Sequence, residues 1–271
     1  MLEVNELKVV YPNGTEALKS ISINAQRGEI IAVIGRSGAG KSTLLRCING
    51  LQKPTSGQII LDGENITAMN NSQLRNARCH IGFIWQEYNL VERLPALTNV
   101  LTGRLGHNRS LASLVYYFDR GHREIALRSL ERVNLMHRAQ LRADQLSGGE
   151  KQRVAIARAI AQQPKIILAD EPVASLDPEL SVQVMSDLAR VAREDGVLTL
   201  INIHHVELAK EFTDRLIGIA QGMVVYDGAP DGLTDEIMHR IYRFDADKAL
   251  PHEKMPSLEP RSFAAQQPLV I

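Results

Sequence analysis

The chain has 271 residues, and its 31 Lys and Arg residues are balanced by 31 Asp and Glu residues, which gives a formal net charge of zero. This balance argues against a nucleic-acid partner, because a protein that coats DNA needs a basic excess to replace the counterions around phosphate. No segment approaches the roughly 18 uninterrupted apolar residues of a membrane-spanning helix. The two cysteines, Cys47 and Cys79, are too few to form a disulfide framework that stabilises the fold. The N-terminus also lacks the basic and apolar segments of a signal peptide. We therefore expect a soluble, cytoplasmic globular protein.

Residues 1–27 are predicted to form β structure. Apolar residues come close to strand alternation in residues 2–9 and again in residues 18–23, and the Pro12-Asn13-Gly14 sequence between them is typical of a turn. The run Ile30–Ile34 is apolar without alternation, which indicates a strand buried on both faces of a sheet. Further short apolar runs predict strands at residues 58–61, 81–84, 166–169 and 197–203.

Helices are predicted between these strands. One begins with Asp177 as its cap and Pro178 in its first turn, and continues to Arg193. Residues 88–163 contain few strand-like runs, and we interpret them as a helical insertion with helices at residues 119–134 and 148–162. Strands that alternate with helices of this length indicate an α/β core with a largely parallel sheet.

The last part of the chain is predicted to contain a hairpin and then a tail. Residues 217–220 and 223–226 are apolar runs joined by Gln221-Gly222, a tight two-residue connection. After Arg243 the sequence carries four prolines and scattered charges, so we expect residues 246–271 to be a flexible tail. The predicted domain therefore covers residues 2–245.

Residues 35–42 form the strongest motif of the sequence. They read Gly-Arg-Ser-Gly-Ala-Gly-Lys-Ser and fit the phosphate-loop pattern G-x-x-x-x-G-K-[ST], with a buried strand before them and a helical pattern after them. Glycines let backbone N–H groups turn toward phosphate oxygens, Lys41 can reach the outer phosphates, and the Ser42 hydroxyl can join the shell of Mg²⁺. The alternative is a glycine-rich turn that matches by chance. The motif alone does not separate a kinase, a GTPase, a DNA-repair ATPase or a transport ATPase.

A second candidate site lies at the end of the predicted strand at residues 166–169, where Asp170 and Glu171 follow. In a phosphate-loop fold such a strand lies beside the loop, so Asp170 can hold the metal through water. Glu171 is expected to face the other way along the strand, where it could orient or deprotonate the attacking water. The alternative is a strand that ends in a solvated acidic turn.

The segment Leu146-Ser147-Gly148-Gly149-Glu150 begins the second helix of the insertion. Ser147 and Glu150 are spaced as a capping box, and a simple helix cap is one interpretation. A cap does not need two glycines, however, and bare backbone at a helix start admits phosphate closely. We therefore predict that this loop serves a nucleotide held by another subunit.

In this order the motifs resemble those of the ATP-binding-cassette superfamily over residues 2–240. The resemblance implies an α/β fold, namely a P-loop nucleotide-binding domain with a mostly parallel core sheet, an N-terminal antiparallel β part and a helical subdomain. The resemblance also implies three further functional residues. These are Gln86, the aromatic residue Tyr11 that stacks on adenine, and the switch histidine, which is His204 rather than its neighbour His205. It also implies ATP and Mg²⁺ as cofactors and a homodimer in which two subunits enclose ATP head to tail.

The resemblance also implies roles for individual residues. Glu171 acts as the base, His204 contacts the γ-phosphate, and Gln86 binds metal or water and senses the membrane partner. The implied metal ligands are Ser42, Gln86 and Asp170. The implied nucleotide-binding residues are Tyr11, Gly35, Arg36, Ser37, Gly38, Ala39, Gly40, Lys41, Ser42, Thr43, Ser147, Gly148, Gly149 and Asp177. The sequence departs from the usual pattern at Glu150, where many members have Gln, and at His205, where Asp or Gln is common.

Several stretches are similar to the phosphonate-import ATPases of bacteria, namely residues 101–105, 143–145, 171–178 and 225–228. This similarity implies an ATPase subunit on the cytoplasmic face of the inner membrane. Its partners would be membrane permease subunits and, indirectly, a periplasmic or surface phosphonate-binding protein. Such an ATPase does not touch the cargo, so the alternative is an importer of another small polar solute, such as phosphate or a polar amino acid. A DNA-associated cassette would need a long coiled-coil insertion or a basic channel, and translation-associated cassette proteins carry two cassettes in one chain.

Overall fold

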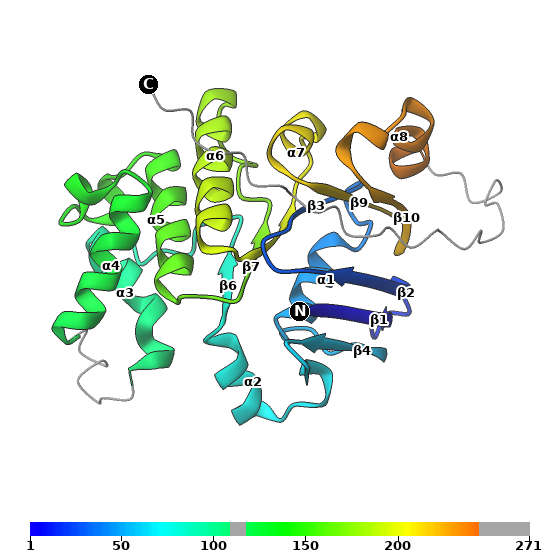
Figure 1. The fold of residues 1–271 in the computed structure, drawn as a ribbon, viewed down its shortest axis with the longest axis horizontal. Coiled ribbons are helices and arrows are strands. Elements are labelled where there is room, and N and C mark those ends of the chain that lie inside the picture. Colours follow the sequence, from blue (N-terminus) through cyan, green and yellow to red (C-terminus); the bar gives the residue numbers. More distant parts are fainter. Residues whose placement is uncertain (109–117, 244–271) are drawn as a thin grey trace, which may run out of the picture.

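The computed structural model describes residues 1–108 and 118–243, which form two β-sheets and the helices packed on them (Figure 1). The first sheet is antiparallel, with the order β2-β1-β4-β5. Its strands are β1 (Leu2–Val10), β2 (Glu16–Ala25), β4 (Ser56–Leu61) and β5 (Glu64–Asn65). The second, or core, sheet has the order β10-β9-β3-β8-β7-β6. Its strands are β3 (Ile30–Ile34), β6 (Ile81–Ile84), β7 (Ile166–Asp170), β8 (Leu198–Asn202), β9 (Arg215–Ala220) and β10 (Met223–Gly228).

The core sheet is parallel except at one edge. β3 pairs in parallel with β8 and β9, and β7 pairs in parallel with β6 and β8, whereas β10 is antiparallel to β9. The predicted α/β architecture, with a mostly parallel core sheet and an N-terminal antiparallel part, is confirmed. The predicted two-residue hairpin is present between β9 and β10, where Gln221 and Gly222 have φ angles of 46° and 78°. Positive φ at both positions is what a type I′ hairpin turn requires.

Helix α1 (Lys41–Ile48) packs between the two sheets. Ile31 and Val33 of β3 contact the apolar cluster that α1 shares with the antiparallel sheet. Ile30 and Ala32 belong to the opposite face of the core sheet, which most of the other helices cover. All residues of β3 are buried, as an apolar run without alternation predicts. The position of the loop that follows β3 is therefore fixed by packing on both faces.

The pairing of β1 with β2 is interrupted where its apolar residues leave strict alternation, between Val4 and Leu7. Glu6 has a positive φ of 47°, and the pairing register with β2 shifts between Val4 and Leu7. A β-bulge of this kind changes the alternation by one residue, so Val4 and Leu7 are both buried although three positions separate them.

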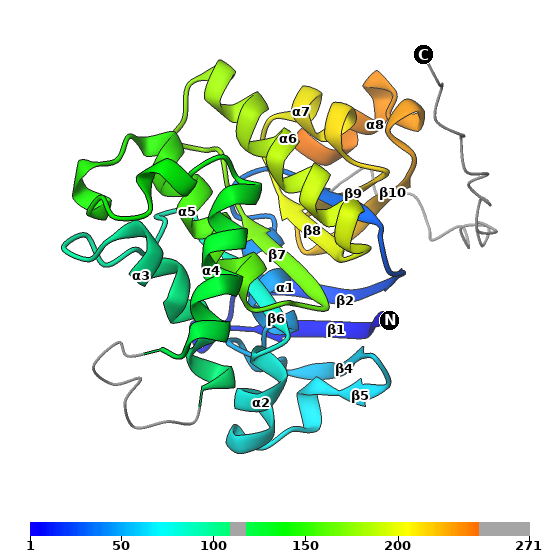
Figure 2. The same ribbon diagram turned by 60° about the vertical axis from the view of Figure 1, so that its left-hand side comes forward.

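The described part of residues 88–163 folds mainly into helices that pack on one another. Helix α5 contacts α3 and α4, and Figures 1 and 2 show these three helices as a group beside α6. The elements of this segment are α3 (Ala96–Leu101), the 3-10 helices η2 (Thr102–His107), η4 (Met136–Arg138) and η5 (Ala143–Gln145), and the helices α4 (Arg120–Arg132) and α5 (Gly148–Ala161). Helix α6 (Pro178–Asp195) comes later in the chain. α4 and α5 agree closely with the predicted helices, whereas α3 was not predicted.

Helix α6 begins as predicted, with the Asp177 side chain accepting a hydrogen bond from Leu180 N at 2.9 Å. It ends later than the predicted Arg193, because the left-handed residue of its C-terminus is Gly196. Among the described residues, no helix is both long and apolar enough to cross a bilayer. The predicted tail at residues 246–271 lies outside the described residues. The remaining helical elements are η1 (Ile66–Ala68), α2 (Asn71–Arg78), α7 (Val206–Phe212), η6 (Pro230–Gly232) and α8 (Asp235–Tyr242).

Candidate functional site

The phosphate loop connects β3 to α1 and is shaped by its glycines. Gly35 and Gly40 have positive φ angles of 152° and 108°. A Cβ atom on Gly35 would lie 2.2 Å from the Ile219 carbonyl oxygen, and one on Gly40 would lie 2.4 Å from the Ala17 carbonyl oxygen. Only glycine fits at these two positions. The loop therefore brings bare backbone to the N-terminus of α1, whose first N–H groups have no partner within the helix.

Lys41 begins α1 and is buried, with 4% of its surface exposed. Its Nζ donates hydrogen bonds to the carbonyl oxygens of Gly35 (2.8 Å) and Arg36 (3.1 Å). Burial lowers the pKa of Lys41, and the charges of Glu171 and Asp170 oppose that shift. No carboxylate in the described part of the chain forms an ion pair with Lys41. Its buried ammonium group is therefore suited to bind an anion that enters the loop.

Three polar side chains meet where β7 and β8 end and α1 begins. Ser42 Oγ donates a hydrogen bond to Asp170 Oδ1 at 2.8 Å, and Asn202 Nδ2 donates to the same oxygen at 2.6 Å. Asn202 Nδ2 also donates to Ser42 Oγ at 3.2 Å. The structure thus brings together two of the three predicted metal ligands, Ser42 and Asp170. Hydroxyl and carboxylate oxygens are ligands that suit Mg²⁺.

Glu171 follows β7 in a left-handed conformation, with a φ of 53°. Strand alternation predicted only that its side chain would face away from that of Asp170. In the structure this backbone turn sets its direction, together with a hydrogen bond from Glu171 N to the Asn202 carbonyl oxygen at 3.0 Å. Glu171 Oε1 lies 2.7 Å from His204 Nε2. The neighbouring His205 occupies the N-cap position of α7 instead, so His204 is the histidine that contacts Glu171.

Gln86 and Tyr11 lie on either side of the residues described above, Gln86 after β6 and Tyr11 beside the first turn of α1. Gln86 is exposed and follows β6. Because β6 and β7 are parallel neighbours, Gln86 lies at the same edge of the core sheet as Asp170. Tyr11 follows β1, and its hydroxyl shares a hydrogen bond of 3.0 Å with Thr43 Oγ1 in the first turn of α1. Its partly exposed ring therefore lies beside the helix that the phosphate loop begins.

Ser147 caps the N-terminus of α5 in the predicted capping box. Its Oγ accepts a hydrogen bond from Glu150 N at 3.3 Å, and Glu150 Oε2 accepts one from Ser147 N at 2.9 Å. The two glycines differ in their surroundings. Gly148 is exposed, whereas Gly149 is buried, and a Cβ atom on Gly149 would lie 3.1 Å from the Leu180 side chain. Packing against α6 thus gives a reason for Gly149, and Ser147 and Gly148 remain as the exposed start of α5.

Comparisons with known proteins decide the family. The ABC transporter family model matches residues 18–174. A phosphonates import ATP-binding protein of Halalkalibacterium halodurans is 48% identical over 242 residues, which cover 89% of this chain and 94% of that protein. A phosphonates import ATP-binding protein of Bacillus thuringiensis subsp. konkukian is 47% identical over 249 residues, which cover 92% of this chain and 97% of that protein. This chain belongs to the ABC transporter family.

A solved ABC cassette has the same fold. It is a dimeric ATP-binding cassette in a post-hydrolysis state, bound to ADP and phosphate, with 34% identity and a TM-score of 0.75, and the match covers 86% of this chain and 100% of that chain. In the present ABC chain, β8 lies between β3 and β7 in the core sheet. The phosphate loop, the Asp170–Glu171 pair and His204 therefore follow three adjacent strands and meet at one edge of the sheet.

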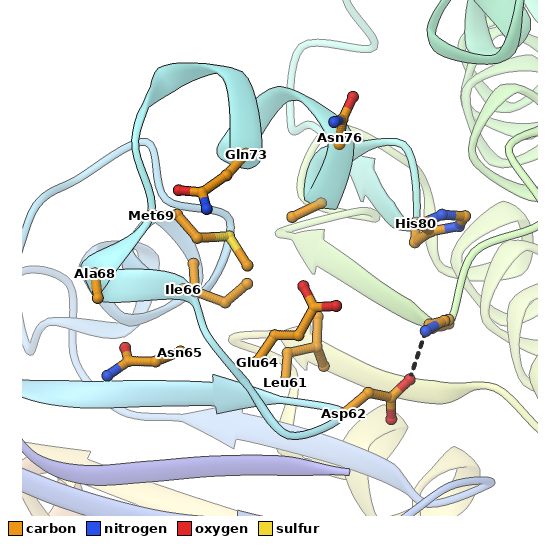
Figure 3. Close-up of a pocket in the computed structure, with 12 residues that line it drawn as sticks. Leu61, Asp62, Glu64, Asn65, Ile66, Ala68, Met69, Gln73, Asn76 and His80 are labelled. Carbon is orange, nitrogen blue, oxygen red and sulfur yellow. Dashed lines mark ion pairs between the residues drawn. The ribbon is translucent and has the colours of Figure 1, made fainter.

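The ABC chain also has a pocket of about 630 Å³ at the opposite edge of the core sheet (Figure 3). His80 and Lys165 line this pocket and immediately precede β6 and β7. The candidate site residues instead follow the carboxyl ends of the core strands. Asp62, which also lines the pocket, forms an ion pair of 3.0 Å with Lys165. This pocket is therefore separate from the phosphate loop.

Asn202 is a residue of the site that sequence analysis missed. It is the last residue of β8 and is fully buried, yet its side chain bonds both Ser42 and Asp170. The one available signal was an amide side chain near the end of the apolar run at residues 197–203. A buried amide needs hydrogen-bond partners, so its presence in such a run indicates polar groups at the strand end.

Proposed function

We propose that this chain is the ATP-hydrolysing subunit of a phosphonate importer. The ATPase activity rests on one observation, the meeting of a phosphate loop, the Ser42–Asp170 pair and the Glu171–His204 pair at one edge of the core sheet. The cargo class is supported by the similarity to phosphonates import ATP-binding proteins, which extends over about nine-tenths of the chain.

The residues at this edge fit ATP with Mg²⁺. Lys41 and the backbone of the phosphate loop would bind the outer phosphates, because an anion stabilises a buried ammonium group that has no ion-pair partner among the described residues. Ser42, Asp170 and Gln86 would hold the metal, the latter two directly or through water. When bound, Mg²⁺ would neutralise part of the charge on the phosphoryl oxygens. Tyr11 would stack on the adenine.

Hydrolysis needs a base beside the γ-phosphate, and Glu171 is the proposed base. Its carboxylate would accept a proton from the attacking water. His204, 2.7 Å from Glu171, would hold that carboxylate in place and contact the γ-phosphate. The Glu171 carboxylate is mostly buried but not sealed from solvent, with 20% of its side chain exposed, so water can reach it.

A second copy of the chain would complete the site. In the proposed homodimer, the exposed Ser147 and Gly148 of one copy, with Gly149 behind them, contact the ATP held by the phosphate loop of the other, and Asp177 lies at the same interface. We assign residues 2–245 to a single ABC domain and residues 88–163 to its helical subdomain.

The import function also requires membrane partners. The ATPase dimer would bind permease subunits at the cytoplasmic face of the inner membrane, and Gln86 would respond to those subunits. A periplasmic or surface phosphonate-binding protein would deliver the cargo to the permease.

The cargo assignment is tested by deleting the gene in a host that has no second phosphonate uptake system. We expect growth on a phosphonate as sole phosphorus source to be abolished and growth on inorganic phosphate to be unchanged. Complementation with the unaltered chain should restore growth, and complementation with Glu171→Gln should not. Normal growth of the deletion strain on several phosphonates would refute the cargo, and a defect on phosphate or a polar amino acid instead would identify another solute.

A further inference from the structure

We infer that Asn202 is the residue that positions the Mg²⁺ ligands Ser42 and Asp170, an inference that rests on the proposed ATPase function. Asn202 ends β8, the strand between β3 and β7. Its pairing register places it opposite Val33 on one side and Asp170 on the other. Asn202 therefore stands between the strand that leads to the phosphate loop and the strand that ends in the metal-binding carboxylate.

The side-chain amide of Asn202 joins two of the three proposed metal ligands, Ser42 and Asp170. Its Nδ2 donates to Asp170 Oδ1 at 2.6 Å and to Ser42 Oγ at 3.2 Å. The orientation of the amide follows from its partners, because the Asp170 carboxylate can only accept hydrogen bonds. Ser42 already donates its hydroxyl proton to Asp170, so it accepts from Nδ2. One amide group thus fixes the relative position of both ligands.

The backbone of Asn202 also forms a hydrogen bond with the backbone of the proposed base, Glu171. Its carbonyl oxygen accepts a hydrogen bond from Glu171 N at 3.0 Å, at the residue where the chain turns through a positive φ. A single buried residue therefore bonds the ligand from α1, the ligand from β7 and the backbone of Glu171. Movement of Asn202 would displace all three groups together.

The amide oxygen of Asn202 is an independent observation at the same place. Among the described residues no group donates a hydrogen bond to Asn202 Oδ1, although the residue is fully buried. A buried acceptor without a donor is unfavourable. Mg²⁺ in proteins usually keeps several water ligands, and each of them is a hydrogen-bond donor. A water ligand of the metal that reached Oδ1 would satisfy this acceptor, and Asn202 would then support the metal as well as its ligands.

A test compares Asn202→Leu and Asn202→Ala with Thr199→Val. Leu has the same branching and number of heavy atoms as Asn, but it is bulkier and has no polar atoms. Ala is the smaller alternative if Leu does not fit in the buried site. Thr199 is the matched control, because it is also fully buried in β8 and its hydroxyl bonds only the Val197 carbonyl oxygen among the described residues, at 3.3 Å. Circular dichroism would show that each variant is folded.

The probe is Mn²⁺, titrated in the presence of a non-hydrolysable ATP analogue and followed by electron paramagnetic resonance. We expect both Asn202 variants to bind Mn²⁺ about 10–100-fold more weakly than the unaltered chain, as is typical for loss of a residue that orients metal ligands. Binding of the analogue in EDTA should change by less than about twofold, and Thr199→Val should behave as the unaltered chain in both measurements.

Three results would overturn the inference. Mn²⁺ affinity within about twofold of the unaltered chain in either folded Asn202 variant would show that Asn202 only fills space. An equal loss in Thr199→Val would show that β8 affects the site through general stability. Failure of the unaltered chain to bind Mn²⁺ with the analogue would contradict the proposed ATPase function itself, and the inference with it.

Discussion

Glu150, in the first turn of α5, has two hydrogen-bond partners that stabilise the start of the helix. Its carboxylate accepts hydrogen bonds from Ser147 N at 2.9 Å and from Arg138 Nε at 3.1 Å. Burial raises the pKa of Glu150, but the hydrogen bonds with Ser147 and the charge of Arg138 outweigh it and lower the pKa below its ordinary value of 4.5. A carboxylate with a lowered folded-state pKa stabilises the fold above its unfolded-state pKa. That stabilisation is lost as the pH falls through the folded-state pKa.

Replacing Glu150 by Gln keeps an acceptor for Ser147 N–H and removes the charge. We expect Glu150→Gln to lower the unfolding midpoint by about 1–2 °C near neutral pH, because the ion pair with Arg138 is partly exposed. The difference should shrink toward zero as the pH falls below 4.5. Thermal unfolding followed by circular dichroism measures both effects. Glu179→Gln is the matched control, since Glu179 is an exposed acid in the first turn of α6 with no ion pair among the described residues. A difference that stays constant with pH would contradict the role of the charge.

At the level of single residues, the sequence predicted which residues belong to the site better than it predicted where their side chains point. Ser42 and Asp170 could be paired in advance because a phosphate-loop fold places their elements side by side. The direction of the Glu171 side chain could not be predicted, since it depends on a positive φ at Glu171 that no residue pattern reveals. Asn202 was missed because one amide in an apolar run has no spacing to mark it, and its role follows only from the strand order.

At the scale of elements, the stretch at residues 101–105 has a packing role. Gly103 lies in η2 against α5, and a Cβ atom there would lie 2.3 Å from the Arg158 carbonyl oxygen. The next residue, Arg104, is buried and donates a hydrogen bond to the Ala161 carbonyl oxygen at 2.9 Å. Both contacts join η2 to α5. Gly103 and Arg104 therefore fix the packing of η2 on α5.

Replacement by Ala should have opposite effects at two glycines of residues 88–163, Gly103 and Gly121. We expect Gly103→Ala to destabilise the fold by roughly 1–3 kcal/mol, because backbone must move to admit the new methyl group. Gly121→Ala should stabilise it by up to about 1 kcal/mol, since Gly121 lies in α4 and a Cβ atom there would come no closer than 3.4 Å to its nearest neighbour. Urea unfolding curves give both free energies of unfolding. Equal effects of the two substitutions would refute the close contact between η2 and α5.

Elements were predictable where caps or apolar runs were strong. β6 has the predicted bounds, and α6 begins at the predicted cap, Asp177. α2 was missed because none of its residues is buried, so no apolar period marks it. The bulge at Glu6 was not predicted, and its one signal in the sequence is the three-residue spacing of Val4 and Leu7.

At the scale of the whole molecule, the cassette carries two separate features suited to phosphate. The phosphate loop lies at the carboxyl edge of the core sheet, and the Ser147 loop begins α5 in the helical group (Figure 2). Among the described residues, the Lys41 ammonium bonds carbonyl oxygens of its own loop, and the Ser147 hydroxyl bonds Glu150. Within one chain, the Lys41 and Ser147 side chains thus each bond to their own segment. We therefore propose that ATP bound by the phosphate loop of one copy contacts the Ser147 loop of a second copy.

The proposal that ATP joins two copies is tested most directly by light scattering of Glu171→Gln with and without nucleotide. Loss of the base should slow hydrolysis by about 10²–10⁴-fold, so we predict a dimer with ATP and a monomer with ADP. Adding Ser147→Arg should abolish the dimer while each copy still binds ATP, because a bulky side chain would block the partner's phosphate. Thr234→Arg, at the exposed cap of α8, is the matched control and should leave the dimer intact. An ATP-dependent dimer that persists with Ser147→Arg would contradict the shared site and reduce the Ser147 loop to a helix cap.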